Sequence, residues 1–169
     1  MAESFAQFMI DKLGAMPPEL IIFIISMIPI LELRGGLIAA ALLKIPVLRA
    51  LPICIIGNII PVPFILLLVT PIFSWLKQTS LFRPMVEKLE ARAMGKSDQI
   101  AKAEFWGLLL FVGIPLPGTG AWTGGLIASV LDIKPKKKAF VAEILGIFLA
   151  SAIMCIATYF IPWVISGVF

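Results

Sequence analysis

Residues 29–36 read PILELRGG and residues 115–125 read PLPGTGAWTGG, and each string interrupts an otherwise apolar stretch of the chain. Proline cannot donate a hydrogen bond inside a helix and glycine favours turns, so both strings should end helices. The limb at 105–114 is only 10 residues long. As a helix it measures about 15 Å, half the thickness of a bilayer core. We therefore expect residues 20–43 and 105–131 to form re-entrant helical hairpins.

The composition is that of an integral membrane protein. Of the 169 residues, 60% are hydrophobic and 14% are charged, whereas soluble proteins carry about 25% charged residues. Residues 50–76 and 144–169 contain no charge and are long enough to cross a bilayer core of about 30 Å. Gly57, Asn58 and Pro61 predict a kink in the first span. The expected fold is all-α, with a hairpin before each transmembrane helix.

We expect one membrane domain over residues 1–169. Its expected parts are an interfacial amphipathic helix at 1–17, a first repeat of hairpin plus span at 18–76, a cytoplasmic interfacial connector at 77–104, and a second repeat of hairpin plus span at 105–169.

An internal repeat supports the division into two halves. A shift of 89 positions aligns residues 34–58 with 123–147 without a gap, and 10 of the 25 positions are identical. A shared Gly-Gly, Pro and Gly in register exceeds what apolar composition alone would give. A hairpin plus one span crosses the membrane an odd number of times, so the two repeats would be inverted. Inverted repeats with broken helices that meet near the midplane occur in many secondary transporters.

The basic residues favour the same arrangement. If the broken segments are hairpins, the face with residues 77–104 and 134–138 carries ten Lys or Arg residues. The opposite face carries three, which are Lys12, Lys44 and Arg49. If all four segments crossed, the two faces would be nearly equal. The positive-inside rule therefore predicts that residues 77–104 are cytoplasmic and that both termini lie outside.

Glu32 and Arg34 are the acid and the base in the interior of an apolar segment. Each costs about 2.5–3.5 kcal/mol on insertion scales, a cost that usually marks function. The structural alternative is an ion pair that pins the hairpin tip. Functionally, Arg34 offers a fork of donors to phosphate or carboxylate, and Glu32 could carry a coupling proton. A cationic substrate could equally pair with Glu32.

The second break adds further candidate contacts. A helix that starts near Thr123 would direct free N–H groups at an anion, and Trp122 would form an apolar or cation–π wall. The alternative for the glycines is close helix packing, and Asn58 could instead bond between helices. The complete set of expected substrate-binding or proton-coupling residues is Glu32, Arg34, Gly35, Gly36, Asn58, Pro115, Pro117, Gly118, Thr119, Gly120, Trp122, Thr123, Gly124 and Gly125.

Several kinds of chemistry are not expected. The chain has no His, so it has neither a Ser–His–Asp triad nor a His-ligated metal site. Cys54 and Cys155 lie in apolar runs without metal-ligand spacing. We expect no enzymatic activity, cofactor or metal. Nucleic acid is not an expected partner, because the basic residues lie between apolar stretches, where lipid headgroups would meet them. Glu143 is expected at the membrane edge.

Two longer strings carry a resemblance to known proteins. PILELRGGLIAAALLKIP at 29–46 and GIPLPGTGAWTGGLIASVL at 113–131 resemble signature segments of the small multidrug export protein family. More distantly, the Pro-x-Pro-Gly element at 115–118 and the acid–Arg pair are similar to the DedA/VTT superfamily. That similarity implies facing re-entrant hairpins and lipid scrambling or translocation of a polyprenyl phosphate carrier. Thr119 stands where DedA proteins usually carry an acid.

These features favour a homodimeric transporter in a prokaryotic inner membrane, with membrane lipids, protons and a small-molecule or lipid-phosphate substrate as partners. The first expectation is proton-linked translocation of a small anionic or lipid-phosphate substrate. Glu32 would carry the proton, and Arg34 with the turn at 118–125 would cradle the anion. One alternative is an exporter of cationic amphiphiles, with Glu32 as counter-charge and Trp122 as wall. A second is a passive lipid scramblase or membrane scaffold.

Overall fold

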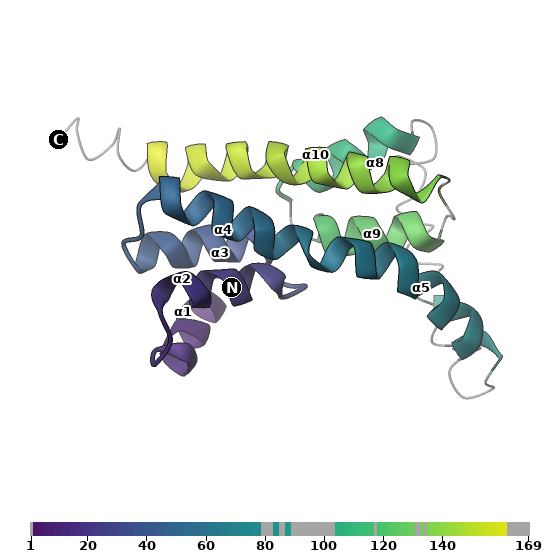
Figure 1. Cartoon of the computed structure of the whole chain (residues 1–169), viewed down its shortest axis with the longest axis horizontal. Helices are drawn as coiled ribbons and strands as arrows, with labels where there is room; N and C mark the ends of the chain where they lie inside the picture. The colour runs from purple at the N-terminus through teal and green to yellow at the C-terminus, as the bar shows by residue number, and fades with distance from the viewer. Residues whose placement is uncertain are drawn as a thin grey trace.

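The structure is a computed structural model, and it describes residues 2–78, 83–84, 87–88, 104–116, 118–130, 133 and 135–161. Within these ranges the regular structure is helical (Figure 1). The helices are α1 (Ala2–Leu13), α2 (Pro18–Met27), α3 (Glu32–Leu42), α4 (Val47–Ile59), α5 (Pro61–Lys77), α8 (Glu104–Gly113), α9 (Ala121–Val130) and α10 (Lys136–Cys155), which continues as the π-helical turn η1 (Ile156–Phe160).

Prolines set the limits of several helices. Ile28 precedes Pro29 and is extended, with φ −76° and ψ 131°, so α2 ends there. The residue before a proline is pushed out of the helical region by the proline ring, which explains this end. Pro46 and Pro135 precede the first residues of α4 and α10 in equivalent extended conformations. In the second half, α8 ends at Gly113 and α9 begins at Ala121, on either side of the proline- and glycine-rich string. Both expected breaks are therefore present.

Within the described part of the chain, two helical stretches are long and apolar enough to cross a membrane. They are Val47–Val69, of 23 residues, and Lys136–Phe160, of 25 residues. The first joins α4 to α5 through Ile60, which keeps helical dihedral angles beside Pro61. The second stretch corrects the start that we expected for the last transmembrane helix, because α10 begins at Lys136 and not at residue 144. Three lysines that we expected in a loop lie in its first turn. Residues 162–169, and most of the expected connector at 77–104, lie outside the described part of the chain.

The helices form two groups with the same order. In the first group α2, α3 and α4 pack on one another, and in the second α8, α9 and α10 do so. Helices α3 and α9 begin 89 residues apart, as do α4 and α10, while α2 and α8 begin 86 residues apart. The start of α3 and the start of α9 meet at the centre of the molecule, and from there the two helices run in opposite directions (Figure 1).

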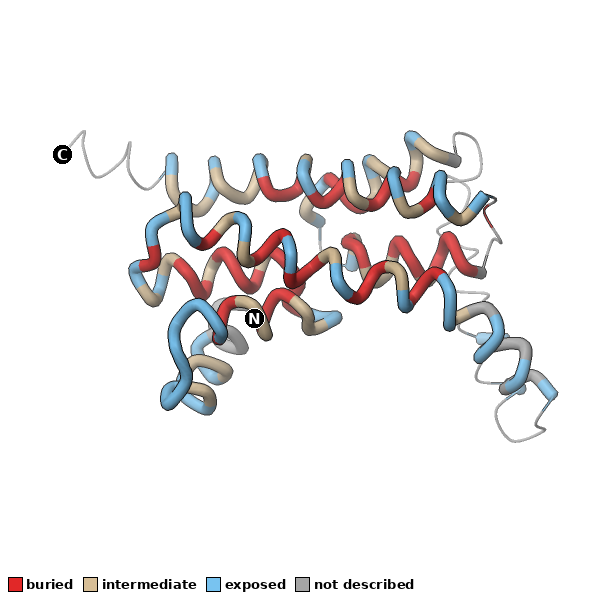
Figure 2. Tube along the Cα trace, viewed as in Figure 1, coloured by how far each residue is buried: buried red, intermediate tan, exposed pale blue. Residues whose placement is uncertain are grey.

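The long helices run antiparallel across these short ones. The path from α4 to α5 crosses the molecule in one direction and α10 returns in the other (Figure 1). As a result, the turn between α3 and α4 lies at one end of the molecule and the start of α10 lies at the opposite end. Burial is concentrated where α2, α3, α4, α9 and α10 meet, whereas α1 and the far part of α5 are largely exposed (Figure 2).

Glycines allow the closest helix contacts. A Cβ atom at Gly57 of α4 would lie 2.8 Å from the carbonyl oxygen of Phe23, on α2. In the second half, a Cβ atom at Gly146 of α10 would lie 2.8 Å from the carbonyl oxygen of Leu109, on α8. Gly57 and Gly146 are equivalent in the sequence repeat. Both halves thus use a small residue to bring a long helix against the first limb of its own broken segment.

Enlarging Gly146 should loosen this contact. In Gly146→Val, the added atoms meet backbone and cannot be accommodated by a rotamer change, so we expect a loss of about 1–3 kcal/mol in the free energy of unfolding. The measurement is the thermal unfolding midpoint in detergent micelles. Ala152→Val on the exposed face of α10 is the matched control and should leave the midpoint unchanged. Equal midpoints for the two variants would contradict the close contact.

Candidate functional site

Glu32 begins α3 in an unusual backbone conformation. Its φ is 50°, in the left-handed region, which costs a non-glycine residue about 1–3 kcal/mol. Its backbone N–H donates to the carbonyl of Ile28 at 2.8 Å, so the turn that follows Pro29 positions it. The residue is 6% exposed. A strained, buried acid at a helix start requires compensating contacts from elsewhere in the fold.

Those contacts come from the second half of the molecule. The Glu32 carboxylate accepts hydrogen bonds from the backbone N–H groups of Ala121, at 3.2 Å, and Trp122, at 3.1 Å. These groups open α9, whose N-terminal N–H groups lack partners within the helix and carry the positive end of its dipole. The anion that we expected at this helix start is therefore, in this structure, the carboxylate of Glu32.

Gly120 makes this approach possible. Its φ is 141°, and a Cβ atom there would collide with the Glu32 carboxylate. Gly120 is therefore required both for its backbone conformation and for the space that it leaves.

Arg34 binds the same turn from the other side. One terminal guanidinium nitrogen donates to the carbonyl of Leu116, and the other donates to the carbonyl of Thr119 at 2.6 Å and to its hydroxyl at 2.9 Å. The Thr119 hydroxyl also donates to the carbonyl of Ile114 at 2.8 Å. Because the guanidinium is a planar fork, it holds two carbonyls of the turn at once. Glu32 and Arg34 thus both bind the opposite break.

Three other expected site residues, Gly35, Gly36 and Asn58, belong to the first half. A Cβ atom at Gly35 would lie 2.6 Å from the Leu31 side chain, and one at Gly36 would lie 2.9 Å from the Cys54 sulfur. These two glycines allow close packing within the first half. Asn58 is buried, and its side-chain oxygen has no hydrogen-bond partner within the described ranges.

The remaining expected residues belong to the second half. Gly118 has a φ of 78° and is exposed in the turn. Pro115 and Thr123 are half-buried. Pro117 lies outside the described residues. Gly124 and Gly125 face α8 and α5, where Cβ atoms would lie 2.6 Å from Val112 and 2.9 Å from Ile65.

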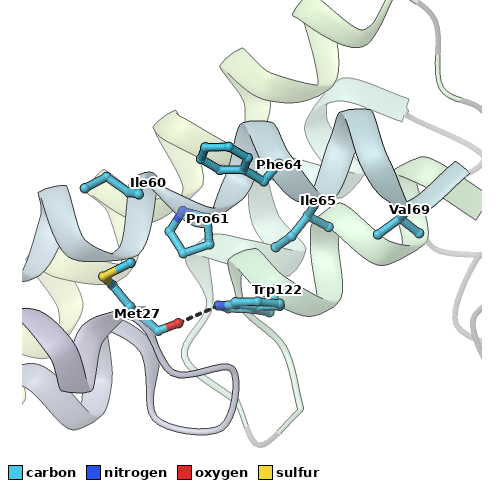
Figure 3. Close-up of a pocket in the computed structure, with 7 residues that line it drawn as sticks. All are labelled: Met27, Ile60, Pro61, Phe64, Ile65, Val69 and Trp122. Atoms are coloured by element: carbon cyan, nitrogen blue, oxygen red, sulfur yellow. Dashed lines mark hydrogen bonds between the residues drawn. The ribbon is translucent and has the colours of Figure 1, made fainter. Parts of the chain in front are cut away.

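Trp122 forms part of an apolar pocket between the two halves. The pocket has a volume of about 380 Å³, within the range of about 300–1,000 Å³ that is usual for small-molecule sites. The indole N–H donates to the carbonyl of Met27 at 3.1 Å, which fixes the ring against the pocket (Figure 3). The lining residues are Met27, Ile60, Pro61, Phe64, Ile65, Val69 and Trp122.

Glu143 is a buried residue to which our sequence interpretation gave no role. We expected it at the membrane edge, and within α10 it is 0% exposed. Neither carboxylate oxygen has a hydrogen-bond partner in the described part of the chain. A pattern in the sequence could have located it, because Glu143 recurs at helical spacing with the small residues Ala139, Gly146 and Ala150 on one face of the helix. No group of three potential metal ligands occurs among the described residues.

Comparison with known proteins gives one match. A family model described as "Putative small multi-drug export protein" matches residues 32–153, which include Glu32, Trp122 and Glu143. No curated protein and no solved structure matches the chain. None of these findings supports the more distant resemblance to the DedA/VTT superfamily.

The contact between Glu32 and Gly120 can be tested by a double-mutant cycle. Gly120→Ala alone should destabilise the protein because the new methyl group collides with the carboxylate. Glu32→Ala removes that carboxylate, so the double variant should be less destabilised than the sum of the single variants, by about 0.5–3 kcal/mol. Thermal unfolding midpoints of the four proteins in detergent provide the measurement. Additive effects would show that the two residues do not touch.

Proposed function

The chain belongs to the small multi-drug export family, and from this premise we propose that it is a membrane transporter which exports apolar and cationic amphipathic small molecules. The family match covers residues 32–153, and two helices have the length and apolar composition of membrane spans. A membrane location and a transport role agree with both observations.

We infer the class of substrate from the residues that line the pocket between the halves. None of the seven residues that line it is charged. An apolar lining favours ligands with a large apolar surface, and the Trp122 ring offers a face to a cationic centre. The pocket also lies between segments from both halves, since Met27 ends α2, Pro61 begins α5 and Trp122 lies in the first turn of α9 (Figure 3). A change in how the halves meet would therefore change the pocket.

The contacts of Arg34 weigh against our first expectation of an anionic or lipid-phosphate substrate. Both terminal nitrogens of its guanidinium donate to the turn of the opposite break. The N–H groups that open α9 are bound by Glu32. A phosphate could use these donors only after the two breaks had separated. Cation export therefore requires fewer rearrangements at the centre of the molecule.

We place the broken segments in the membrane as re-entrant hairpins, related by inversion. Helices α2, α3, α8 and α9 are 10 or 11 residues long. At about 1.5 Å per residue they reach about half way through a bilayer core. The opposed directions of α3 and α9 support the inversion, as does the meeting of their N-termini at the centre. In this arrangement the connector at 77–104 is cytoplasmic, and both termini lie outside.

We assign to Glu32 a role in linking protons to this movement. Its charged form caps α9, because a carboxylate is attracted to the N–H groups and the positive dipole end of that helix. A proton on the carboxylate would remove this attraction and weaken the contact between the two breaks. Proton binding and a change in the shape of the pocket would then be coupled. A passive scramblase or a scaffold, the remaining alternative, would show no such dependence.

Transport of a lipophilic cation tests the role of the pocket. In proteoliposomes, uptake of tetraphenylphosphonium by Trp122→Ala should fall about 5- to 30-fold, which corresponds to the loss of about 1–2 kcal/mol of aromatic contact. Trp106→Ala on the exposed face of α8 is the matched control, because Trp106 is 64% exposed and lies outside the pocket. If Trp122→Ala transports as well as the control, the pocket is not the binding site.

Cysteine accessibility tests the topology. With Cys54 and Cys155 replaced by alanine, Lys44→Cys and Lys137→Cys place single thiols at exposed positions before α4 and in the first turn of α10. If the broken segments are re-entrant, a membrane-impermeant maleimide should label the two positions from opposite sides of the membrane. Labelling of both positions from one side would mean that all four apolar segments cross.

A further inference from the structure

Glu143 is a buried acid whose carboxylate has no hydrogen-bond partner among the residues that the structure describes. It is 0% exposed, and neither of its carboxylate oxygens is hydrogen-bonded within the described ranges. An ionised carboxylate that is buried without a hydrogen bond or counter-charge is among the most costly groups in an apolar interior. A bound cation, either a proton or a positively charged substrate group, would supply the missing partner.

The surroundings of Glu143 place it beside the pocket. A Cβ atom at Gly125 of α9 would lie 3.4 Å from one Glu143 oxygen and 2.9 Å from the Ile65 side chain. Ile65 lines the apolar pocket. The Glu143 carboxyl and the Ile65 side chain therefore both approach the space left by Gly125, so the carboxyl lies near the pocket lining. A second glycine, Gly124, faces the same carboxylate oxygen of Glu143.

The first half shows that helix packing at this position does not require an acid. A shift of 89 positions aligns Cys54 with Glu143 and Gly36 with Gly125. Cys54 packs against Gly36, where a Cβ atom would lie 2.9 Å from the sulfur. The same contact between a long helix and a Gly-Gly pair is therefore made with a small neutral side chain. The carboxyl in the second half is additional to what the packing needs.

Glu32 is the titratable neighbour that matters most for Glu143. The helices packed against α10 are α3, α4, α5, α8 and α9, together with η1. Their titratable or charged residues, with those of α10 itself, are Glu32, Arg34, Arg49, Cys54, Lys77, Glu104, Lys136, Lys137, Lys138, Cys155 and Tyr159. Among the described groups, the charge of Glu32 acts on Glu143. Lys136, two turns earlier on the same helix, instead donates to the carbonyl of Leu66 at 2.6 Å.

The two carboxyls lie along one helix. Glu32 binds the first turn of α9 at Ala121 and Trp122, and Glu143 faces Gly124 and Gly125 in the next turn. Both carboxyls therefore lie against α9, and like charges that act on each other in an apolar interior repel. With both carboxyls charged, two negative charges would oppose each other at the centre of the molecule. A cation bound beside Glu143 would relieve that repulsion.

We propose that Glu143 is a proton-binding residue of the transport cycle, and that it gives up its proton when a cationic substrate occupies the pocket beside it. This inference rests on the proposed export function. The exchange balances in charge, because the O–H bond of the carboxyl breaks, the proton leaves to water, and the cation takes its place as the counter-charge of the carboxylate. The negative charge of Glu32 opposes loss of this proton until the cation is present to compensate it.

Proton release on substrate binding tests the proposal. Detergent-solubilised wild-type protein in a weakly buffered solution with a pH-sensitive dye should release about one proton for each tetraphenylphosphonium bound. Glu143→Gln and Glu143→Cys should abolish the release, and the cysteine variant should fold because that residue occupies the equivalent position of the first half. Glu19→Gln, which changes an exposed acid of α2, is the matched control and should release protons as the wild type does. Proton release that persists in both Glu143 variants would overturn the proposal.

A second measurement separates this proposal from the export function. Dicyclohexylcarbodiimide reacts with protonated carboxyls in apolar surroundings, and peptide mass spectrometry identifies the modified residue. We expect modification of Glu143, and slower modification when tetraphenylphosphonium is present. Modification at Glu143 without any binding of the cation would refute cation export and leave a proton-binding residue in place. A Glu143 side chain that stays unmodified would refute the proton site itself.

Discussion

The contact between Glu32 and the start of α9 is the interaction on which the centre of the molecule depends. It joins the two halves at the point where each is weakest, because both segments break there and leave backbone groups without helical partners. It also compensates the strained backbone of Glu32. Arg34 adds a second attachment to the same turn, so one short segment of the first half satisfies both the N–H groups and the carbonyls of the second.

In this arrangement the charged pair has a structural role, because it holds the two breaks together. Any functional role would come from breaking this contact when the halves move apart. The charges of Glu32 and Arg34 act on each other, as our structural alternative supposed, but each residue makes its hydrogen bonds to the opposite break. A contact made of two charged groups in an apolar setting is strong while it is complete and costly when it is half broken. Such a contact suits a protein that alternates between a closed and an open arrangement of its halves.

Much of the fold follows from residues that act locally. Pro29, Pro46 and Pro135 end or precede helices because proline constrains itself and its predecessor, and this can be deduced without the structure. The partners of Glu32 and Arg34 could not be deduced, because they lie 82–90 residues away. The start of α10 was misjudged because we assigned Lys136–Lys138 to a loop, although lysines can occupy a first helical turn with their charges directed outward.

The burial of Glu143 was not predicted, for a different reason. Its place was judged from the charges beside it in the sequence, whereas its burial is decided by the face of α10 on which it lies. Ala139, Gly146 and Ala150 share that face, and small residues mark the side of a helix that neighbouring helices approach. Periodicity would therefore have been a better guide than the distance from the nearest lysine.

The numbering of the central contact shows how the two halves are related. Glu32 and Ala121 are 89 residues apart, the same offset that aligns the two halves, so each occupies the position of the other in the repeat. Equivalent positions touch only beside the axis that relates two copies, so this contact marks that axis. The halves are not interchangeable there, because the first supplies the carboxylate and the second supplies the N–H groups that bind it.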